Sequence, residues 1–175
     1  MGYRLEKMIS EEQIKKRISE LGKQITNDYK DEDLLIVGIL KGSMPFTCSL
    51  MWAIDNPNMS VDFMCVSSYG SETESSGIVR ILKDLDDSIE GKNVLIVEDI
   101  VDTGRTMSKL LELLSTRNPK SIKICTLLDK PSRRTVDVRI DYIGFEIENR
   151  FVAGFGLDYD QKLRQLQYIG EVVFD

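Results

Sequence analysis

The sequence predicts an α/β fold in which helices flank a central parallel sheet. Apolar runs of strand length alternate with segments whose apolar residues recur at helical spacing, and this order is typical of such folds. The run "DLLIVGIL" at 33–40 is apolar on both faces, so helices are expected to cover it on both sides. With 175 residues, 42% of them hydrophobic, and no Pro/Gly/Ser-rich linker, the chain is expected to form one domain, 1–175.

The first elements follow from capping signals and apolar periodicity. Residues 10–13 fit a capping box, and the isoleucines and leucine after it recur at helical spacing, which predicts an amphipathic helix. The apolar strand 33–40 comes next. Ser43 and Pro45 then suit the cap and first turn of a second helix, which is expected to run to about Asp55.

The later elements alternate in the same way. A helix over 106–117 places leucines and a methionine on one face. The loop "GSETESSG" at 70–77 is small, acidic and polar, and has nothing to bury. The expected strands are 61–69, 77–82, 93–100, 121–128, 141–147 and 168–174, with the last two partly in a small separate lobe.

Composition limits the function. The net charge of −6 and the pI near 4.9 argue against nucleic-acid or anionic-membrane partners, which attract basic surfaces. No apolar stretch is long enough to cross a bilayer and the N-terminus lacks the apolar core of a signal peptide, so a cytoplasmic location is expected. Histidine is absent, which excludes Ser-His-Asp and Cys-His triads. The cysteines lack metal-site spacing and are expected to fill the core: Cys48, Cys65 and Cys125.

In the segment "VLIVEDIVDTGRTM" at 94–107, a predicted buried strand ends in two acidic residues. Buried carboxylates are expensive unless they are paired or bind a metal, so Glu98 and Asp99 need compensation. The turn at 102–106 supplies hydroxyls, a glycine and backbone N–H donors before a helix, and this mixture suits a phosphate. For the turn alone, an ordinary threonine helix cap is an equally good interpretation. The two acids favour a phosphorylated sugar, because its hydroxyls need acceptors.

Five segments together resemble a known family. "VLIVEDIVDTGRTM" closely resembles the phosphoribosyl pyrophosphate signature of the type I phosphoribosyltransferases. Four further segments, in the same order, resemble the bacterial-type hypoxanthine-guanine phosphoribosyltransferases: "LKGSMPF" at 40–46, "SSYG" at 67–70, "LLDKPSRR" at 127–134 and "GFEIENRFVAGFGLDYDQKLR" at 144–164. The resemblance implies a Rossmann-like sheet with a small hood lobe formed by N- and C-terminal segments.

The resemblance implies a site for phosphoribosyl pyrophosphate. It assigns the ribose hydroxyls to Glu98 and Asp99, directly or through Mg²⁺. In the family, the aspartate that matches Asp102 lies near the imidazole-ring nitrogen of the purine and exchanges its proton, which is general acid–base catalysis. The alternative is that Asp102 only shapes the turn. The resemblance assigns the 5′-phosphate to the residues of the turn, namely Asp102, Thr103, Gly104, Arg105 and Thr106.

The resemblance places the pyrophosphate at a second loop. Lys41 and Gly42 match a loop in which a backbone N–H contacts the leaving group and the peptide is often strained or cis. On spacing alone, this step is an ordinary turn. Arg164 would add positive charge at the pyrophosphate, with an exposed helix arginine as the alternative. Asp158 matches a further magnesium ligand.

The purine is assigned to later segments by the same resemblance. Phe151, alternatively a core residue, matches the aromatic that stacks on the base. Lys130 matches the lysine that donates to the exocyclic oxygen of hypoxanthine or guanine, where adenine carries an amine. Val152 matches a residue whose backbone contacts the purine edge. Ser68 and Tyr69 match a lid that shields the sugar from water, in a loop that otherwise indicates a flexible surface connection.

The implied function is Mg²⁺-dependent, reversible transfer of a phosphoribosyl group from phosphoribosyl pyrophosphate to hypoxanthine or guanine, by a homodimer or homotetramer. A xanthine-preferring transferase remains an alternative, as does a regulator of the same fold that senses phosphoribosyl pyrophosphate and binds nucleic acid. The acidic charge and the lack of an added nucleic-acid-binding domain disfavour the regulator. No G-x-G-x-x-G follows a strand, which disfavours an unrelated Rossmann-type nucleotide binder.

Overall fold

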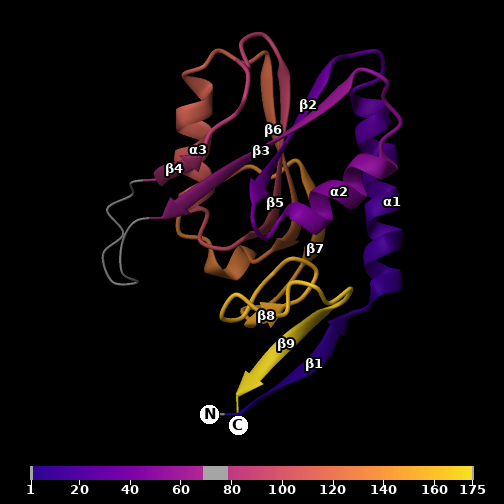
Figure 1. The fold of residues 1–175 in the computed structure, drawn as a ribbon, viewed down its shortest axis with the longest axis vertical. Helices are drawn as coiled ribbons and strands as arrows, with labels where there is room; N and C mark the ends of the chain where they lie inside the picture. Colours follow the sequence, from indigo (N-terminus) through magenta and orange to yellow (C-terminus); the bar gives the residue numbers. More distant parts are fainter. Residues whose placement is uncertain (1, 69–78, 175) are drawn as a thin grey trace.

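Figure 1 shows the chain in a computed structural model, which describes residues 2–68 and 79–174. Strands and helices alternate through most of the chain. The helices are α1 (Glu11–Asp28), α2 (Met44–Ala53), α3 (Arg105–Ser115) and the short 3₁₀ helix η1 (Pro131–Arg133). The strands are β1 (Tyr3–Ile9), β2 (Leu34–Leu40), β3 (Met59–Ser68), β4 (Val79–Lys83), β5 (Asn93–Val101), β6 (Ser121–Asp129), β7 (Tyr142–Glu146), β8 (Val152–Ala153) and β9 (Ile169–Phe174).

The strands form two sheets. The main sheet has the order β4-β3-β2-β5-β6-β7, and its neighbours are parallel except for β3 and β4. The smaller antiparallel sheet, β1-β9-β8, is called the hood. It lies on the side of the main sheet at which β3 ends, and it brings the two ends of the chain together (Figure 1). The predicted α/β class with a parallel sheet is confirmed.

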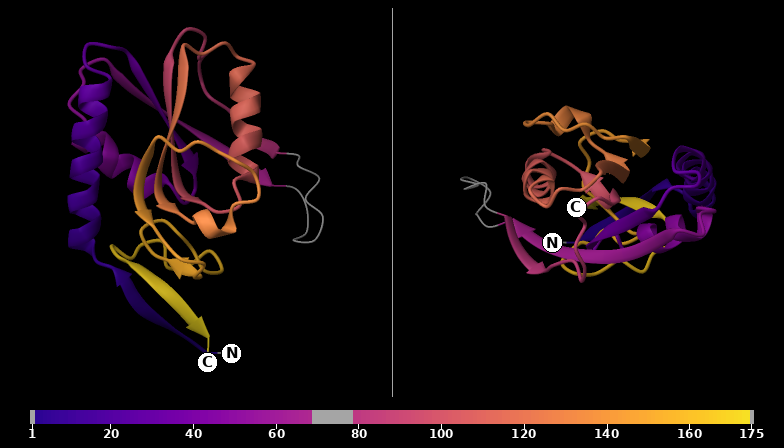
Figure 2. Two further views of the ribbon diagram at one scale, coloured as in Figure 1. Left: turned by 180° about the vertical axis from the view of Figure 1, so that it is seen from behind. Right: turned by 90° about the horizontal axis from the view of Figure 1, so that it is seen from above.

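Helices cover both faces of the main sheet, as the two views in Figure 2 show. On β2, Leu34 and Ile36 belong to a core cluster with α1 and α2, whereas Leu35 and Val37 belong to a second cluster with α3. Successive strand residues point to opposite faces, so a strand without a polar face is buried on both sides. The first cluster also contains Ile169 of the hood, and the two sheets therefore share a core.

The first two helices begin at the predicted residues, but only the first has the predicted side-chain cap. The Gln13 N–H donates to Ser10 Oγ at 3.2 Å and the Ser10 N–H donates to Gln13 Oε1 at 2.8 Å, which completes the capping box. α2 begins after Ser43 and has Pro45 in its first turn, but the Ser43 side chain makes no capping bond. α3 begins one residue before the predicted position and ends two residues before the predicted end.

The predicted placement of 141–147 is wrong. β7 is an edge strand of the main sheet, parallel to β6, and does not belong to the hood. Arg17 of α1 donates to the carbonyl oxygens of Ile143 at 2.7 Å and Gly144 at 3.0 Å, so a helix side chain holds this strand. The hood position of the last strand is confirmed. β1 and β8 were not expected as strands, because β1 is mostly exposed and charged and β8 has only two residues.

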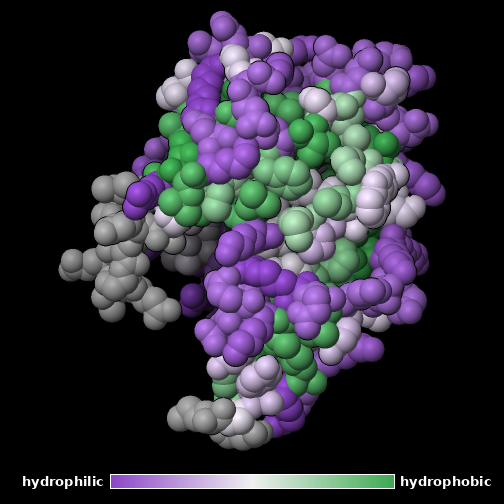
Figure 3. Space-filling view, in the orientation of Figure 1, coloured by the Kyte–Doolittle hydropathy of each residue, from purple (hydrophilic) through white to green (hydrophobic). Residues whose placement is uncertain are grey.

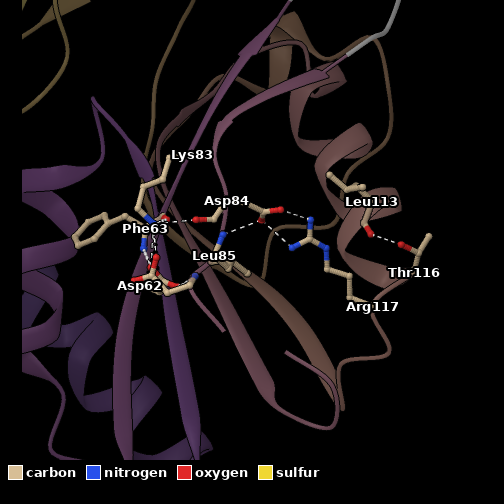
Figure 4. A network of polar contacts seen from close by, with 9 residues as sticks. Asp62, Phe63, Lys83, Asp84, Leu85, Leu113, Thr116 and Arg117 are labelled. Carbon is tan, nitrogen blue, oxygen red and sulfur yellow. Dashed lines mark hydrogen bonds and ion pairs between the residues drawn. The ribbon is translucent and has the colours of Figure 1, made fainter. Parts of the chain in front are cut away.

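The carboxyl end of α3 is tied to the β3–β4 pair by the polar network in Figure 4. Just after α3, Arg117 donates to both carboxylate oxygens of Asp84, each at 2.8 Å, and its guanidinium lowers the pKa of Asp84. Lys83 of β4 forms ion pairs with Asp62 of β3 at 3.4 Å and with Asp86 at 3.2 Å. The network therefore fixes one end of α3, while the other end faces the candidate site.

Apolar side chains gather across the middle of one face, over β3 and α2 (Figure 3). Two large apolar residues of α2 are exposed, Trp52 at 78% and Met44 at 52%. The predicted core role of the cysteines is confirmed for Cys125, which is fully buried, whereas Cys48 and Cys65 are only partly buried. No helix in the described residues is long and apolar enough to cross a membrane.

Candidate active site

The loops with most of the predicted site residues leave the carboxyl ends of neighbouring strands. Lys41 follows β2, Asp102 follows β5 and Lys130 follows β6. β2 and β5 are neighbours, and the chain continues from them to opposite sides of the sheet. Ligands of open α/β sheets bind at such a switch point. A cavity of about 110 Å³ opens at the end of β5, lined by Glu98, Ile100, Val101, Asp102, Thr103, Gly104, Thr106 and Met107.

The turn between β5 and α3 presents backbone donors. Gly104 is the N-cap of α3, with a φ of 85° in the left-handed region, and as a glycine it has no side chain with which to cap the helix. The Arg105 N–H donates to Thr103 Oγ1 at 3.4 Å. Within the described residues, the N–H groups of Thr106 and Met107 have no acceptor. The alternative of a threonine N-cap is therefore wrong, and the helix start is open to an anion.

A second loop packs over this turn and fixes its shape. The carbonyl oxygen of Thr103 accepts the N–H groups of Thr135 at 3.0 Å and Val136 at 3.2 Å. Arg105 Nε donates to Thr135 Oγ1 at 3.2 Å. A Cβ at position 104 would lie 2.7 Å from the Val136 carbonyl oxygen, so both this contact and the positive φ require Gly104.

Glu98 and Asp99, called the acid pair below, lie in the last part of β5 and are partly buried. Glu98 Oε1 accepts the Asp99 N–H at 3.1 Å, and Asp99 Oδ1 accepts the Ile100 N–H at 2.7 Å. Burial raises the pKa of both carboxyls, and the charge of Asp99 raises the pKa of Glu98 further. No lysine or arginine in the described part of the chain forms an ion pair with either acid. The two backbone N–H bonds, and the charge of Arg164, which lowers the pKa of Asp99, therefore compensate the burial of the pair only in part.

The loop after β2 packs against the acid pair. The Leu40–Lys41 peptide bond is cis, one residue before the predicted Lys41–Gly42 step. Gly42 is buried against Asp99, because a Cβ added at Gly42 would overlap Asp99 Oδ2. The exposed Lys41 lines a cavity of about 330 Å³ together with Arg164. The structure therefore brings the predicted pyrophosphate loop next to the predicted ribose and metal ligands.

Lys130 and Asp102 lie near an arginine that no motif in the sequence singled out. Lys130 is only 7% exposed; the loss of water lowers the pKa of its ammonium, and the charge of Asp102 opposes this shift. Arg133 Nε donates to Asp102 Oδ1 at 3.1 Å. Arg134 instead pairs with the buried Asp129. The signal for Arg133 was its place in "LLDKPSRR", three residues after Lys130, but two adjacent arginines did not show which one faces the site.

Next to β8, an aromatic side chain is exposed. Phe151 is 48% exposed, so the alternative of a core residue is wrong. Its ring contacts Tyr159 and Phe174, with centroid distances of 5.8 Å and 6.3 Å. Val152, the next residue, is buried in β8. Neighbouring rings hold Phe151 while it keeps enough exposed surface to stack on a flat ligand.

Arg164 is held by an irregular loop, not a helix, so the alternative of a helix arginine is wrong. It donates to the carbonyl oxygen of Gly156 at 2.7 Å and forms an ion pair with Asp158 at 3.0 Å. Asp158 Oδ2 also accepts the Gln161 N–H at 2.8 Å. The described residues contain no group of three acidic or cysteine side chains placed around one metal position, so Asp158 does not join the acid pair.

A family model for the phosphoribosyl transferase domain matches residues 7–160. The chain belongs to the phosphoribosyl transferase family. The transferase is 54% identical to the hypoxanthine phosphoribosyltransferase of Escherichia coli K12, over 99% of this chain and 98% of that protein. It is 52% identical to the hypoxanthine-guanine phosphoribosyltransferase of Bacillus subtilis 168, over 97% of this chain and 94% of that one. A crystal structure of a hypoxanthine phosphoribosyltransferase from Staphylococcus aureus matches with a TM-score of 0.92 and 50% identity, over 95% of this chain and 90% of the other.

The transferase thus has the predicted site residues of three strand ends in one region. The two residues of the predicted lid lie at or beyond the edge of the described part of the chain. Ser68 is the last residue of β3 and pairs with Val79 of β4, and Tyr69 lies outside the described residues. The loop between β8 and β9 approaches the same region, because a Cβ at Gly156 would overlap the carbonyl oxygen of Gly42.

Proposed function

We propose that this transferase moves the 5-phosphoribosyl group reversibly from phosphoribosyl pyrophosphate to hypoxanthine or guanine, forming inosine or guanosine monophosphate and pyrophosphate. Relatives that match nearly the whole chain are named for this base specificity. The observation that carries the proposal is the uncapped start of α3 beside the acid pair. One strand end thereby offers donors for a phosphate and acceptors for a ribose diol.

The chain's own groups bind the activated sugar at both ends. The turn at 102–106 holds the 5′-phosphate through backbone N–H groups and threonine hydroxyls, at the positive end of the α3 dipole. Backbone N–H groups at Lys41 and Gly42, with the guanidinium of Arg164, hold the pyrophosphate. The cavity shared by Lys41 and Arg164 supports this assignment. The sugar lies between them, over the acid pair.

The acid pair fits Mg²⁺. This ion prefers oxygen ligands and uses one or two carboxylates together with substrate oxygens. Glu98 and Asp99 are adjacent, have raised pKa values and lack a paired cation, so a bound dication would remove their mutual repulsion. When bound, Mg²⁺ neutralises charge on the departing pyrophosphate. Asp158 is proposed as a separate ligand, because it does not share a position with the acid pair.

The purine is held between two loops and the hood. Phe151 stacks on the base, the Lys130 ammonium donates to the exocyclic oxygen, and the backbone at Val152 contacts the purine edge. Asp102 takes the proton from the imidazole-ring nitrogen as that nitrogen bonds to the anomeric carbon, and returns it in the reverse reaction. The exposure of Phe151 and the burial of Lys130 support these roles.

A steady-state assay with phosphoribosyl pyrophosphate, Mg²⁺ and four bases tests the function. Hypoxanthine and guanine are expected to give nucleotide, whereas adenine is expected to have a kcat/KM at least about 100-fold lower, because its amine leaves the Lys130 ammonium unpaired. A preference for xanthine would favour the alternative transferase. No nucleotide with any base would contradict the proposal.

Gly42→Ala tests the contact between the pyrophosphate loop and the acid pair. The added Cβ must push the Asp99 carboxylate aside, and a side-chain end can move without unfolding the protein. We expect kcat/KM for phosphoribosyl pyrophosphate to fall about 10- to 100-fold, since small misplacements of reacting groups are costly. Ser115→Ala, at an exposed position in the last turn of α3 and away from both loops, is the control. Equal kinetics for Gly42→Ala and the wild type would contradict this arrangement.

Other properties stay predictions with partial support. The exposed Trp52 and Met44 support association as a homodimer or homotetramer. The core shared by the two sheets supports one domain. A cytoplasmic location, the absence of nucleic-acid and membrane partners, and a lid formed by Ser68 and Tyr69 rest on the sequence.

A further inference from the structure

Arg133 makes a side-chain contact that the proposed reaction does not yet explain. It is the last residue of η1, and its N–H donates to the Lys130 carbonyl oxygen at 3.0 Å. Its Nε donates to Asp102 Oδ1 at 3.1 Å. The side chains of Arg133 and Asp102 are 48% and 42% exposed, so the pair lies at an open surface. The proposed proton acceptor is therefore held by a guanidinium before any base binds.

A second cation, Lys130, lies near Asp102 but does not pair with it. The charges of Asp102 and Arg133 both act on Lys130, but no hydrogen bond or ion pair joins Lys130 to Asp102 in the described structure. The other charges of this loop, Arg134 and Asp129, satisfy each other. One carboxylate thus lies near two cations and pairs only with Arg133.

An ion pair between Lys130 and Asp102 would disable both residues. The ammonium would be occupied when the exocyclic oxygen of the purine arrives, and the carboxylate would be turned from the imidazole-ring nitrogen. An exposed guanidinium is a suitable competitor, because its planar fork fixes the carboxylate geometry better than an ammonium does.

We propose that Arg133 is a positioning residue, which holds the Asp102 carboxylate away from Lys130 and so keeps the ammonium free for the purine oxygen. The proposal rests on the proposed roles of Asp102 and Lys130. Arg133 acts through these two residues and needs no contact with the base itself.

The consequence for pH dependence has a definite sign. The charged ammonium of Lys130 is a stronger donor than the neutral amine, so base binding weakens as the pH rises through the pKa of Lys130. Burial lowers this pKa most, Arg133 lowers it further, and Asp102 raises it. Removal of the Arg133 charge therefore raises the pKa of Lys130, and an ion pair with the released Asp102 raises it again. The alkaline limb of kcat/KM for hypoxanthine should move to higher pH.

The experiment compares Arg133→Ala, Arg133→Gln and Arg133→Lys with Arg139→Ala. Arg139 is a matched control, because its side chain is 89% exposed and pairs with Asp141, which has no proposed catalytic role. We expect the Ala and Gln variants to lose about 2- to 5-fold in kcat/KM for hypoxanthine below the alkaline limb, the size expected for an exposed ion pair. Their alkaline limbs should lie at higher pH. The Lys variant should retain the wild-type limb, and KM for phosphoribosyl pyrophosphate should change less than the base parameters.

The outcomes distinguish a failure of this proposal from a failure of the proposed function. If the wild type forms no nucleotide, the function fails first. If the wild type is active and Arg133→Gln matches Arg139→Ala in both kcat/KM and alkaline limb, only the role of Arg133 is overturned. A loss of activity with an unmoved limb, which Arg133→Lys does not rescue, would indicate a structural role and would also overturn it. The Gln variant keeps the test valid if the Ala variant does not fold.

Discussion

Replacement of Asp102 by asparagine is expected to lower kcat for inosine monophosphate formation about 100- to 10,000-fold, the range for loss of a general acid–base group. KM for hypoxanthine and for phosphoribosyl pyrophosphate should change only a few-fold. Asparagine has the same shape as aspartate, and its Oδ1 can still accept the hydrogen bond from Arg133 Nε. A neutral amide cannot take the proton of the imidazole-ring nitrogen. The turn should therefore survive while the chemical step is lost.

Asp137→Asn is the control for this variant, since Asp137 is an exposed acid in the loop that covers the turn. Steady-state kinetics give kcat and KM, and calorimetry gives the affinity for phosphoribosyl pyrophosphate. Similar losses in kcat and in sugar affinity would show that Asp102 mainly shapes the turn. A kcat equal to that of Asp137→Asn would remove Asp102 from the chemistry altogether.

The main sheet was predictable because its signals are local. The strand at 33–40 lacks a polar face, and this pattern is typical of a parallel strand covered by helices on both sides. The capping box at 10–13 fixes the start of α1 through bonds between residues three apart. Such features depend on neighbours in the chain, and sequence spacing reveals them.

The choice of sheet for the last strands was not predictable in the same way. The segments 141–147 and 168–174 both predict short strands, but no pattern within either segment indicates which strand it pairs with. β7 joins β6 and is held by Arg17, which lies more than 120 residues away. β9 pairs instead with β1, whose Tyr3 lies opposite Phe174. These contacts are made by tertiary packing, which overrides local preference.

The site residues also differ in how well the sequence could place them. Residues at strand ends could be placed, because parallel strands bring their carboxyl ends to one edge. The contact of Gly42 with Asp99 needed the adjacency of β2 and β5, and the pairing of Arg164 with Asp158 needed the path of an irregular loop. The choice between Arg133 and Arg134 depended on side-chain direction within one short helix. None of these is encoded in residue spacing.

Glu98→Gln is expected to make the metal-free protein more stable and the enzyme much less active. The folded-state pKa of Glu98 lies above its usual value of 4.5, because burial and the charge of Asp99 disfavour the carboxylate. An acid with a raised folded-state pKa costs stability at every pH above its unfolded value, in full above the folded-state pKa, and the penalty disappears as the pH falls to the unfolded value. Glutamine removes the charge and the repulsion. Without Mg²⁺ at pH 7.5, Tm should rise about 2–4 °C, the shift that corresponds to about 1 kcal/mol in a domain of this size.

The same substitution should weaken the response to metal. Mg²⁺ binding to the native state raises Tm by mass action, so the wild type should gain stability when Mg²⁺ and pyrophosphate are added, and Glu98→Gln should gain less. Melting curves at pH 7.5 and near pH 4.5, with chelator or with Mg²⁺, measure both effects on stability. In the kinetic assay, kcat/KM for phosphoribosyl pyrophosphate should fall at least about 10-fold, because a ligand of the metal is lost. Glu90→Gln, at an exposed acid outside the site, is the matched control and should change neither quantity. If Glu98→Gln melts like Glu90→Gln with chelator and responds equally to Mg²⁺, the acid pair is not a stored repulsion that a metal relieves, and the metal assignment loses its physical basis.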